Sequence, residues 1–463
     1  MLPLAKEFHS NSQIMTTQQA TKKSIGVFAL QLDGMGDIIG GAKVAAMVQQ
    51  IFPAYEVIFS VVQPSLSLME KMMFASNKHV IDASELSTLT DLTFCKEKQL
   101  PKKIDACACM IIYPTYHDST IPKFIRESNV PMLRLREYGA GQPTRGTVEG
   151  TVYPLGVGKE DYGLILDPDL YAYGEKHRGD QSLQRLAQLQ FLPSALTKLI
   201  LGRSFNKTSL EEFAQNNKLF SGYGYHDSAI TDFIEALCTF DSSNNLTICL
   251  LNQPVKDIHS LLRKTLFNNN FKEISIYTPN EKQGWDCKNL EFKEKTKGNR
   301  KCKLIFAKLE PAHSLTLAKA SEPQTLTTGD QSFIERLLLR HYPLYDCRPH
   351  KIPFIHSIIE SAKQLDKEAA SLLQTSIFGN EDPLEILQMI DEGKAVGHLF
   401  FQPNLVHYFK KFTNDQKLGE SWNNIVTHLY QNHNAKDLLQ PIIAQALPAS
   451  RNDQLSLSEN TNK

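Results

Sequence analysis

The chain has 463 residues, 41% of them hydrophobic, and its 50 lysine and arginine residues balance its 50 aspartate and glutamate residues. This length predicts more than one domain, because a single hydrophobic core rarely grows past about 250–300 residues. The zero net charge disfavours a general nucleic-acid-binding protein, which would carry a basic excess. No apolar run is long enough to cross a bilayer, and the first residues contain no uninterrupted apolar segment of the signal-peptide type.

The eight cysteines are scattered and include no C-x-x-C pair. We therefore expect reduced thiols in a cytosolic protein and no structural zinc site. Cys107 and Cys109 stand two apart in an apolar, strand-like run, so they are expected on the same face of that strand.

In the first part of the chain, apolar runs alternate with helical spacing, which predicts a parallel sheet covered by helices. Residues 1–23, by contrast, are polar and aperiodic, as in a flexible arm. Residues 139–182 are rich in glycine, proline and tyrosine and are expected to be irregular. The expected strands are 27–32, 56–62, 104–113 and 130–136, and the expected helices are 42–50, 65–74 and 120–128.

After a helical segment at 182–201, a second alternating block begins near residue 219. Its charged stretch 281–303 is expected to be an exposed insertion. The expected strands are 246–251, 273–277, 303–307, 325–328 and 342–345, and the helices are 227–239, 255–267, 311–320 and 331–339. Beyond residue 351 only helices are expected, at 352–363, 367–375, 383–390, 404–412, 420–430 and 435–447.

The predicted fold class is therefore α/β, with two Rossmann-like domains facing across a cleft and a helical C-terminal extension. The expected limits are an arm at 1–23, an N-terminal domain at 24–200, a C-terminal domain at 201–350, the extension at 351–447 and a disordered tail at 448–463.

The first expected strand runs into a glycine-rich turn that holds two carboxylates, Asp33 and Asp37, beside Gly36. The glycines around them (34, 36, 40 and 41) do not follow G-x-G-x-x-G, so a dinucleotide cofactor is disfavoured. Carboxylates repel phosphate, and they fit better as groups that accept a proton from a substrate or orient it. The alternative is that both acids only bond backbone amides of the turn and helix start.

A second turn follows the expected strand at 325–328 and contains Gly329, Asp330, Gln331 and Ser332. We call the turn with Asp33 and Asp37 the first elbow and this turn the second elbow. The N-terminus of the following helix suits a diphosphate, and Ser332 could add a hydroxyl donor. Asp330 would then hold sugar or ribose hydroxyls. The alternative is that Asp330 and Ser332 only cap the helix.

Two elbows, one in each Rossmann-like half, are what a glycosyltransferase of the GT-B type requires. The segment QLDGMGDIIGGAKVAAMV resembles the first motif of the protein-arginine rhamnosyltransferases that modify elongation factor P, with Asp33 and Asp37 at the positions of that family's two acids. TTGDQSF is similar to the family's Gly-Glu-Asp-Ser-Phe segment, except that Asp330 and Gln331 replace its two acids. In GYGYHDSAITDF, Tyr225 matches a tyrosine that lies near the nucleotide base.

The resemblance implies an inverting, metal-independent glycosyltransferase in which Asp33 and Asp37 are the catalytic carboxylates. The domain 24–200 would bind the acceptor and the domain 201–350 the nucleoside-diphosphate sugar, which is a co-substrate, so no cofactor is expected. The implied acceptor is a protein arginine, and no nucleic acid or membrane span is expected. The predicted location is the cytoplasm of a bacterium, with export as an effector left open.

Three further residues are candidates for phosphate contact because they follow expected strands: His313, Arg348 and His350. For His313 a surface or capping role is favoured over phosphate contact, and Lys43 is expected to be solvated. Three other functions remain open: a GT-B transferase acting on a lipid, a polysaccharide or another protein, a non-catalytic interaction protein on this scaffold, and a sugar-nucleotide epimerase.

Overall fold

The structure is a computed structural model that describes residues 24–31, 35–63, 93–94, 99–115, 120–138, 152–177, 182–252, 254–255, 258, 271–280, 284–291, 299–392 and 402–448. The arm at 1–23, the helix expected at 65–74 and most of the helix expected at 255–267 lie outside these residues. Asp33 and nearly all of the tail expected at 448–463 lie outside them as well.

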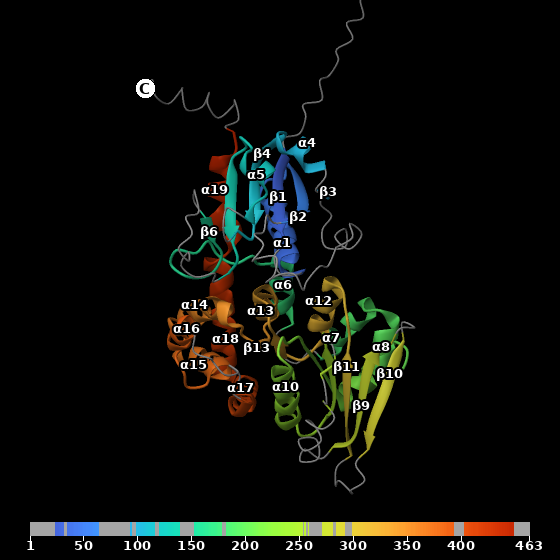
Figure 1. The fold of residues 1–463 in the computed structure, drawn as a ribbon. Helices are drawn as coiled ribbons and strands as arrows, with labels where there is room; N and C mark the ends of the chain where they lie inside the picture. The colour runs from blue at the N-terminus through green and yellow to red at the C-terminus, as the bar shows by residue number, and fades with distance from the viewer. Residues whose placement is uncertain are drawn as a thin grey trace, which may run out of the picture.

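The first sheet is parallel and has the strand order β3-β2-β1-β4-β5-β6 (Figure 1). Every residue of its central strand β1 is buried, as expected for a continuous apolar run covered on both faces. The strands are β1 (Ser24–Leu30), β2 (Glu56–Val62), β3 (Thr93–Phe94), β4 (Cys107–Tyr113), β5 (Met132–Arg136) and β6 (Val152–Pro154). Chain order reverses between β1 and β4, which makes this the switch point of the sheet.

The second sheet has the order β10-β9-β11-β8-β7-β12-β13 and is parallel except for its edge strand β10. Its switch point lies between β7 and β12. The strands are β7 (Asn217–Gly222), β8 (Asn245–Leu250), β9 (Phe271–Pro279), β10 (Trp285–Glu291), β11 (Arg300–Phe306), β12 (Gln324–Thr327) and β13 (Tyr342–Tyr345).

Helices cover both faces of each sheet. The helices up to residue 240 are α1 (Met35–Ile51), α4 (Leu100–Ile104), α5 (Lys123–Arg126), α6 (Pro168–Lys176), α7 (Ser182–Leu186), η3 (Ala187–Phe191), α8 (Ser194–Leu201), α9 (Lys207–Asn216) and α10 (Asp227–Phe240). The later ones are α12 (Pro311–Ala320), α13 (Asp330–Leu338), η4 (Pro349–Lys351), α14 (Ile352–Lys363), α15 (Lys367–Phe378), α16 (Pro383–Asp391), α17 (Gln402–Asn414), α18 (Gln416–Asn432) and α19 (Ala435–Ala446). Among the described residues, no helix is both long and apolar enough to cross a membrane.

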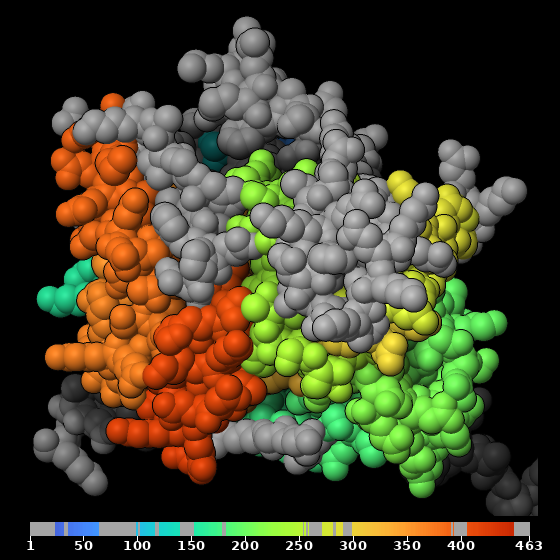
Figure 2. Space-filling view, turned by 90° about the horizontal axis from the view of Figure 1, so that it is seen from below, coloured from blue at the N-terminus to red at the C-terminus, as the bar shows by residue number. Residues whose placement is uncertain are grey.

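The C-terminal helices pack on both sheets. Phe409 of α17 lies against Phe233 and Phe240 of α10, with ring centroids 6.4 and 5.9 Å apart, and Figure 2 shows this part of the chain beside α10 on the lower surface. The last helix, α19, returns to contact α1, β4 and β5 of the first sheet. A backbone bridge between Leu164 and Asn434 fixes this return. The fold is thus α/β with two Rossmann-like units, followed by helices that join both.

Several local expectations were wrong. Helix α1 begins at Met35 rather than residue 42, so the glycines at 36, 40 and 41 are helical. The irregular segment 139–182 contains helix α6, which Asp167 caps by accepting from two backbone amides. The charged insertion contains strand β10, which gains its hydrogen bonds from β9 although its own residues are mostly polar.

Cys107 and Cys109 do not share a face of β4. Cys107 packs in the core on the α4–α5 side of the sheet, whereas Cys109 packs in the core on the other side. A register shift between β1 and β4 falls at this point, since Ser24 pairs with Cys107 and the next residue, Ile25, pairs with Cys109. The extra residue of this bulge cancels the simple alternation of faces.

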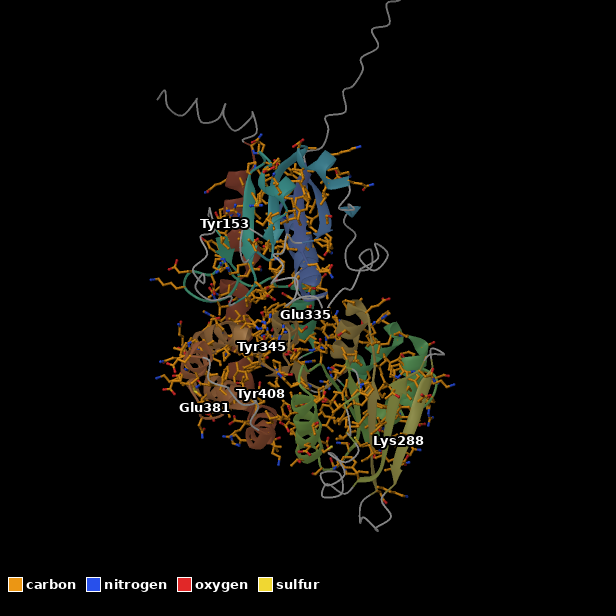
Figure 3. All side chains as sticks on the ribbon, viewed as in Figure 1. Tyr153, Lys288, Glu335, Tyr345, Glu381 and Tyr408 are labelled. Carbon is orange, nitrogen blue, oxygen red and sulfur yellow. The ribbon has the colours of Figure 1, made fainter. Side chains whose placement is uncertain are left out.

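The carboxyl ends of the two sheets face each other. Glu137 and Tyr138, which follow β5, contact residues that follow β12 and β13. Lys43 of α1 forms an ion pair with Glu335 of α13, so its expected solvation was wrong. Figure 3 shows Glu335 at the level where the two units meet.

Candidate functional site

The first elbow, between β1 and α1, lies at the switch point of the first sheet. Asp37 stands in the first turn of α1 and is buried, with only 7% of its surface exposed. Gly36 is exposed, and a Cβ atom placed on it would meet no atom of the described residues within 4 Å. The elbow therefore presents an open backbone beside a carboxylate, while its second carboxylate, Asp33, lies outside the described residues.

The glycines deeper in α1 serve packing. A Cβ on Gly41 would lie 2.6 Å from the Cβ of Ala29, and one on Gly40 would lie 2.5 Å from Cε1 of Tyr113. Glycine at these positions lets α1 lie directly on β1 and β4. Only part of the glycine-rich pattern is thus available to a ligand.

The second elbow stands at the switch point of the second sheet. Gly329 is the N-cap of α13 and receives no side-chain cap, so the expectation that Asp330 or Ser332 caps the helix is not met. Among the residues that the structure describes, a Cβ on Gly329 would meet only Ser332, whose Oγ would lie 3.5 Å from it. The amides at the start of α13 and the helix dipole therefore favour an anionic group here.

Tyr225 lies beside this elbow, in the loop after β7. Its side chain is 60% exposed, and the guanidinium carbon of Arg348 lies 5.0 Å from the ring centroid. The loop is held by Asp346, which follows β13 and is 1% exposed. The carboxylate of Asp346 accepts from the backbone N–H groups of Tyr225 (2.6 Å) and His226 (2.8 Å), and it lies 2.7 Å from His226 Nδ1. Its charge also suits the N-terminus of α10.

Asp330 is buried and belongs to a network of polar side chains. One carboxylate oxygen accepts from the hydroxyl of Tyr345, and the other lies 2.8 Å from Lys351 Nζ. The same Lys351 ammonium lies 2.9 Å from Oε1 of Glu137, which belongs to the first unit. Burial raises the pKa of Asp330 to about 6, although Lys351 works in the opposite direction.

Gln331 also reaches the first unit. Its Oε1 accepts from the hydroxyl of Tyr138 at 3.0 Å, and its Nε2 donates to the carbonyl of Ile165 at 3.2 Å. The two side chains that depart from the resembled motif, Asp330 and Gln331, therefore link the two units in this structure.

Some of the predicted site residues lie together at the switch point of the second sheet, and others do not. Tyr225, Gly329 and Ser332 lie around one switch point, together with Arg348. His313 begins a helix after β11, which β8 and β7 separate from β12, and its Nδ1 lies 3.8 Å from Glu310. Asp346, Lys351 and Glu137 were missed, although Asp346 directly follows an expected strand, the same signal that drew attention to Arg348.

No group of three or more histidine, cysteine, aspartate or glutamate side chains among the described residues could hold a metal ion. The seven described cysteines are all free thiols. Burial raises the pKa of Cys109 and of Cys249 to about 12, so these thiols are protonated at neutral pH and are poor nucleophiles.

The architecture is that of an α/β protein with two Rossmann-like units whose carboxyl edges confront each other, the GT-B arrangement. The chain matches no protein-family model and no curated protein sequence. Among solved structures, it resembles a glycosyltransferase from Rickettsia africae at 9% identity and a TM-score of 0.43, over 92% of this chain and 97% of that chain.

A second similar structure is EarP, which mediates arginine glycosylation of translation elongation factor EF-P, at 11% identity and a TM-score of 0.42, over 92% of this chain and all of that one. A third is UDP-GlcNAc 2-epimerase from Neisseria meningitidis, at 12% identity and a TM-score of 0.39, over 92% of this chain and 99% of that chain. Likenesses at this level do not identify a shared function.

Proposed function

We propose that this protein is a GT-B glycosyltransferase that moves a sugar from a nucleoside-diphosphate donor to an acceptor. The observation that carries the proposal is the pair of elbows: each stands at the switch point of a sheet, and the edges that bear them face each other. Ligands of open α/β sheets bind at such points. Two facing switch points suit a reaction with two substrates.

In this proposal the second elbow binds the donor. The exposed ring of Tyr225, with Arg348 above it, offers a surface on which a nucleobase stacks. The amides after Gly329 and the hydroxyl of Ser332 neutralise the diphosphate, including the charge that develops as it leaves. Because the carboxylate oxygens of Asp330 and the amide of Gln331 already have partners, we assign these two residues to fixing the elbow.

The first elbow supplies the chemistry. A carboxylate, Asp37 or Asp33, accepts a proton from the acceptor while the acceptor attacks the anomeric carbon from the face opposite the diphosphate. This inverts the configuration, and the process as proposed needs no metal. Two carboxylates also suit a protein arginine as acceptor, because they can bind its guanidinium through charge-assisted, bidentate hydrogen bonds.

Donor turnover by Asp37→Asn and Asp33→Asn tests this assignment. Loss of a general base typically lowers the rate about a hundred- to ten-thousandfold, so we expect that decrease in at least one variant, with donor affinity retained. Asp437→Asn is a matched control, since Asp437 is an exposed acid in the first turn of α19. Near-normal turnover in both elbow variants would contradict the catalytic role.

The same assay separates the competing functions. An epimerase would interconvert free sugar nucleotides without any acceptor, whereas a non-catalytic protein would consume no donor. Release of nucleoside diphosphate that increases when a protein substrate is added supports transfer to a protein.

A further inference from the structure

A group of buried basic residues lies at the amino edge of the second sheet, opposite the second elbow. It comprises Arg185 of α7, Arg336 near the end of α13, and His341, which directly precedes β13. Their exposed fractions are 9%, 5% and 4%. The backbone N–H of His341 donates to the carbonyl of Arg336 at 2.9 Å, which places these two residues at one turn.

The three side chains carry nitrogen atoms that have no hydrogen-bond partner within the described part of the chain. These atoms are Nε and Nη1 of Arg336, Nε of Arg185 and Nδ1 of His341. A buried polar atom without a partner is rare in folded proteins, and a buried cation without one is costly. Four such atoms on three neighbouring residues are hydrogen-bonding groups that a bound ligand could satisfy.

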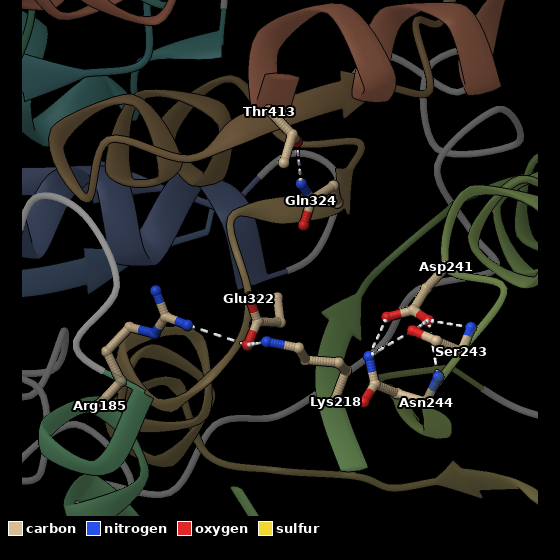
Figure 4. A network of polar contacts seen from close by, with 8 residues as sticks. All are labelled: Arg185, Lys218, Asp241, Ser243, Asn244, Glu322, Gln324 and Thr413. Carbon is tan, nitrogen blue, oxygen red and sulfur yellow. Dashed lines mark hydrogen bonds and ion pairs between the residues drawn. The ribbon is translucent and has the colours of Figure 1, made fainter. Parts of the chain in front are cut away.

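The local charge is also unbalanced. Figure 4 shows Glu322 between two cations: its Oε1 lies 2.9 Å from Nη2 of Arg185 and 3.5 Å from Nζ of Lys218. Glu335, the acid next to Arg336 in sequence, is paired with Lys43. Glu335 also raises the pKa of Arg336, so it acts on both cations. The two acids Glu322 and Glu335 are thus outnumbered by four cations, Arg185, Lys218, Lys43 and Arg336.

Burial is the main cause of the pKa shifts of these groups, and neighbouring charges add to it at His341. Burial lowers the pKa of Arg336 to about 10. Burial, together with Arg336 and Arg185, holds the pKa of His341 well below its usual range, so its ring is neutral. A neutral imidazole can still donate one N–H.

We propose that Arg336, Arg185 and His341 form a buried binding site for a small oxyanion such as phosphate. The open N–H groups of the two guanidinium groups, Nε and Nη1 of Arg336 and Nε of Arg185, can each donate to an oxygen of such an anion, and His341 adds a further donor. The site lies at the opposite edge of the sheet from the proposed donor, so it stands or falls independently of the transferase function. Its occupant would fix the end of α13 against α7.

Thermal unfolding of the full chain in inorganic phosphate, with ionic strength held constant by chloride, tests the site. A ligand that binds only the folded state must raise the melting temperature, so we expect a saturable rise of several degrees. Arg336→Met should abolish the rise. Arg203→Met is the matched control, because Arg203 is an exposed arginine paired with Glu212, and it should keep the rise.

Without phosphate, Arg336→Met should melt at or above the temperature of the unaltered chain, because it removes an unpaired buried charge. An equal phosphate response in Arg336→Met would place the anion elsewhere, for instance at the second elbow, and would overturn the proposal. Absence of any saturable response in the unaltered chain would overturn it too. If Arg336→Met does not fold, Arg336→Lys is the second test. It keeps the positive charge but replaces the planar guanidinium with an ammonium group, and it should weaken phosphate binding at least tenfold.

Discussion

Asp346 shows how one buried carboxylate can set the position of an exposed binding surface. It is almost completely buried and engages two backbone amides and one imidazole nitrogen of the Tyr225–His226 loop. His226 is the N-cap of α10 and makes no cap with its own side chain. Asp346 therefore takes the place of a local cap and also holds Tyr225 beside the second elbow.

Asp346→Asn should weaken both folding and donor binding. The amide carries no charge, and its NH2 group replaces one of the two carboxylate oxygens that now contact the Tyr225–His226 loop. We expect the free energy of unfolding to fall by about 1–3 kcal/mol, as for other buried groups left without a partner. Nucleotide affinity should fall in parallel, as measured by titration under conditions where the variant is folded. Asp227→Asn, an exposed acid in the same helix, is the control and should change neither quantity. An unaltered stability for Asp346→Asn would contradict this role.

Asp330 should give an unusual dependence of stability on pH. Its pKa in the folded chain is raised to about 6, above the value of about 3.9 for an unperturbed aspartate. The folded state then binds a proton that the unfolded state lacks between these values, so the stabilisation is complete below about pH 4 and is lost as the pH rises through 6.

The comparison with Asp330→Asn, which cannot titrate, isolates this effect. The free energy of unfolding of the unaltered chain, relative to the variant, should increase by about 1 kcal/mol between pH 7 and pH 5. Urea denaturation of both proteins at the two pH values measures it. If the difference in free energy of unfolding between the two proteins decreases on acidification, the ion pair with Lys351, rather than burial, determines the pKa of Asp330.

At the scale of elements, helix α1 combines a packing surface with an open end. A Cβ on Gly41 would collide with Ala29, whereas one on Gly36 would lie more than 4 Å from every described neighbour. Gly41→Ala should therefore lower the free energy of unfolding by about 1–3 kcal/mol, the usual effect of overpacking. Gly36→Ala should leave it unchanged or raise it by up to about 1 kcal/mol, because alanine favours a helix. Urea denaturation of the two variants checks the contrast, and equal effects would contradict the assigned packing.

Elements with strong apolar periodicity were predictable from the sequence. The bounds expected for β2, α12, β13 and α14 agree with the structure. The apolar residues of β2, β13 and α14 fill a buried strand or face one core, a pattern that is visible in the sequence, whereas those of α12 divide between two cores. Strand β10 was not predictable, since its polar residues form a strand only through pairing with β9. The bulge that separates Cys107 from Cys109 depends on register and leaves no local trace in the sequence.

At the scale of the molecule, the positions of the two elbows followed from the alternation of strands and helices, but their side-chain partners did not. Lys351 lies between Asp330 and Glu137, and Tyr138 donates to Gln331, because the two units dock in a particular way. Such contacts join residues separated by as many as 214 positions in the chain. Local patterns carry no information about them, and the sequence alone predicts the donor as the partner of Asp330 and Gln331.

The central claim is that the second elbow binds a nucleoside diphosphate, and the melting temperature of the chain with a panel of these nucleotides tests it most directly. We expect at least one of UDP, dTDP, GDP and ADP to raise the melting temperature by several degrees in a saturable way, since ligands of the folded state stabilise it. Tyr225→Ala should lose most of that rise while melting normally without nucleotide, because the ring is exposed. If no nucleotide raises the melting temperature, or if the rise survives in Tyr225→Ala, the proposed donor site is wrong.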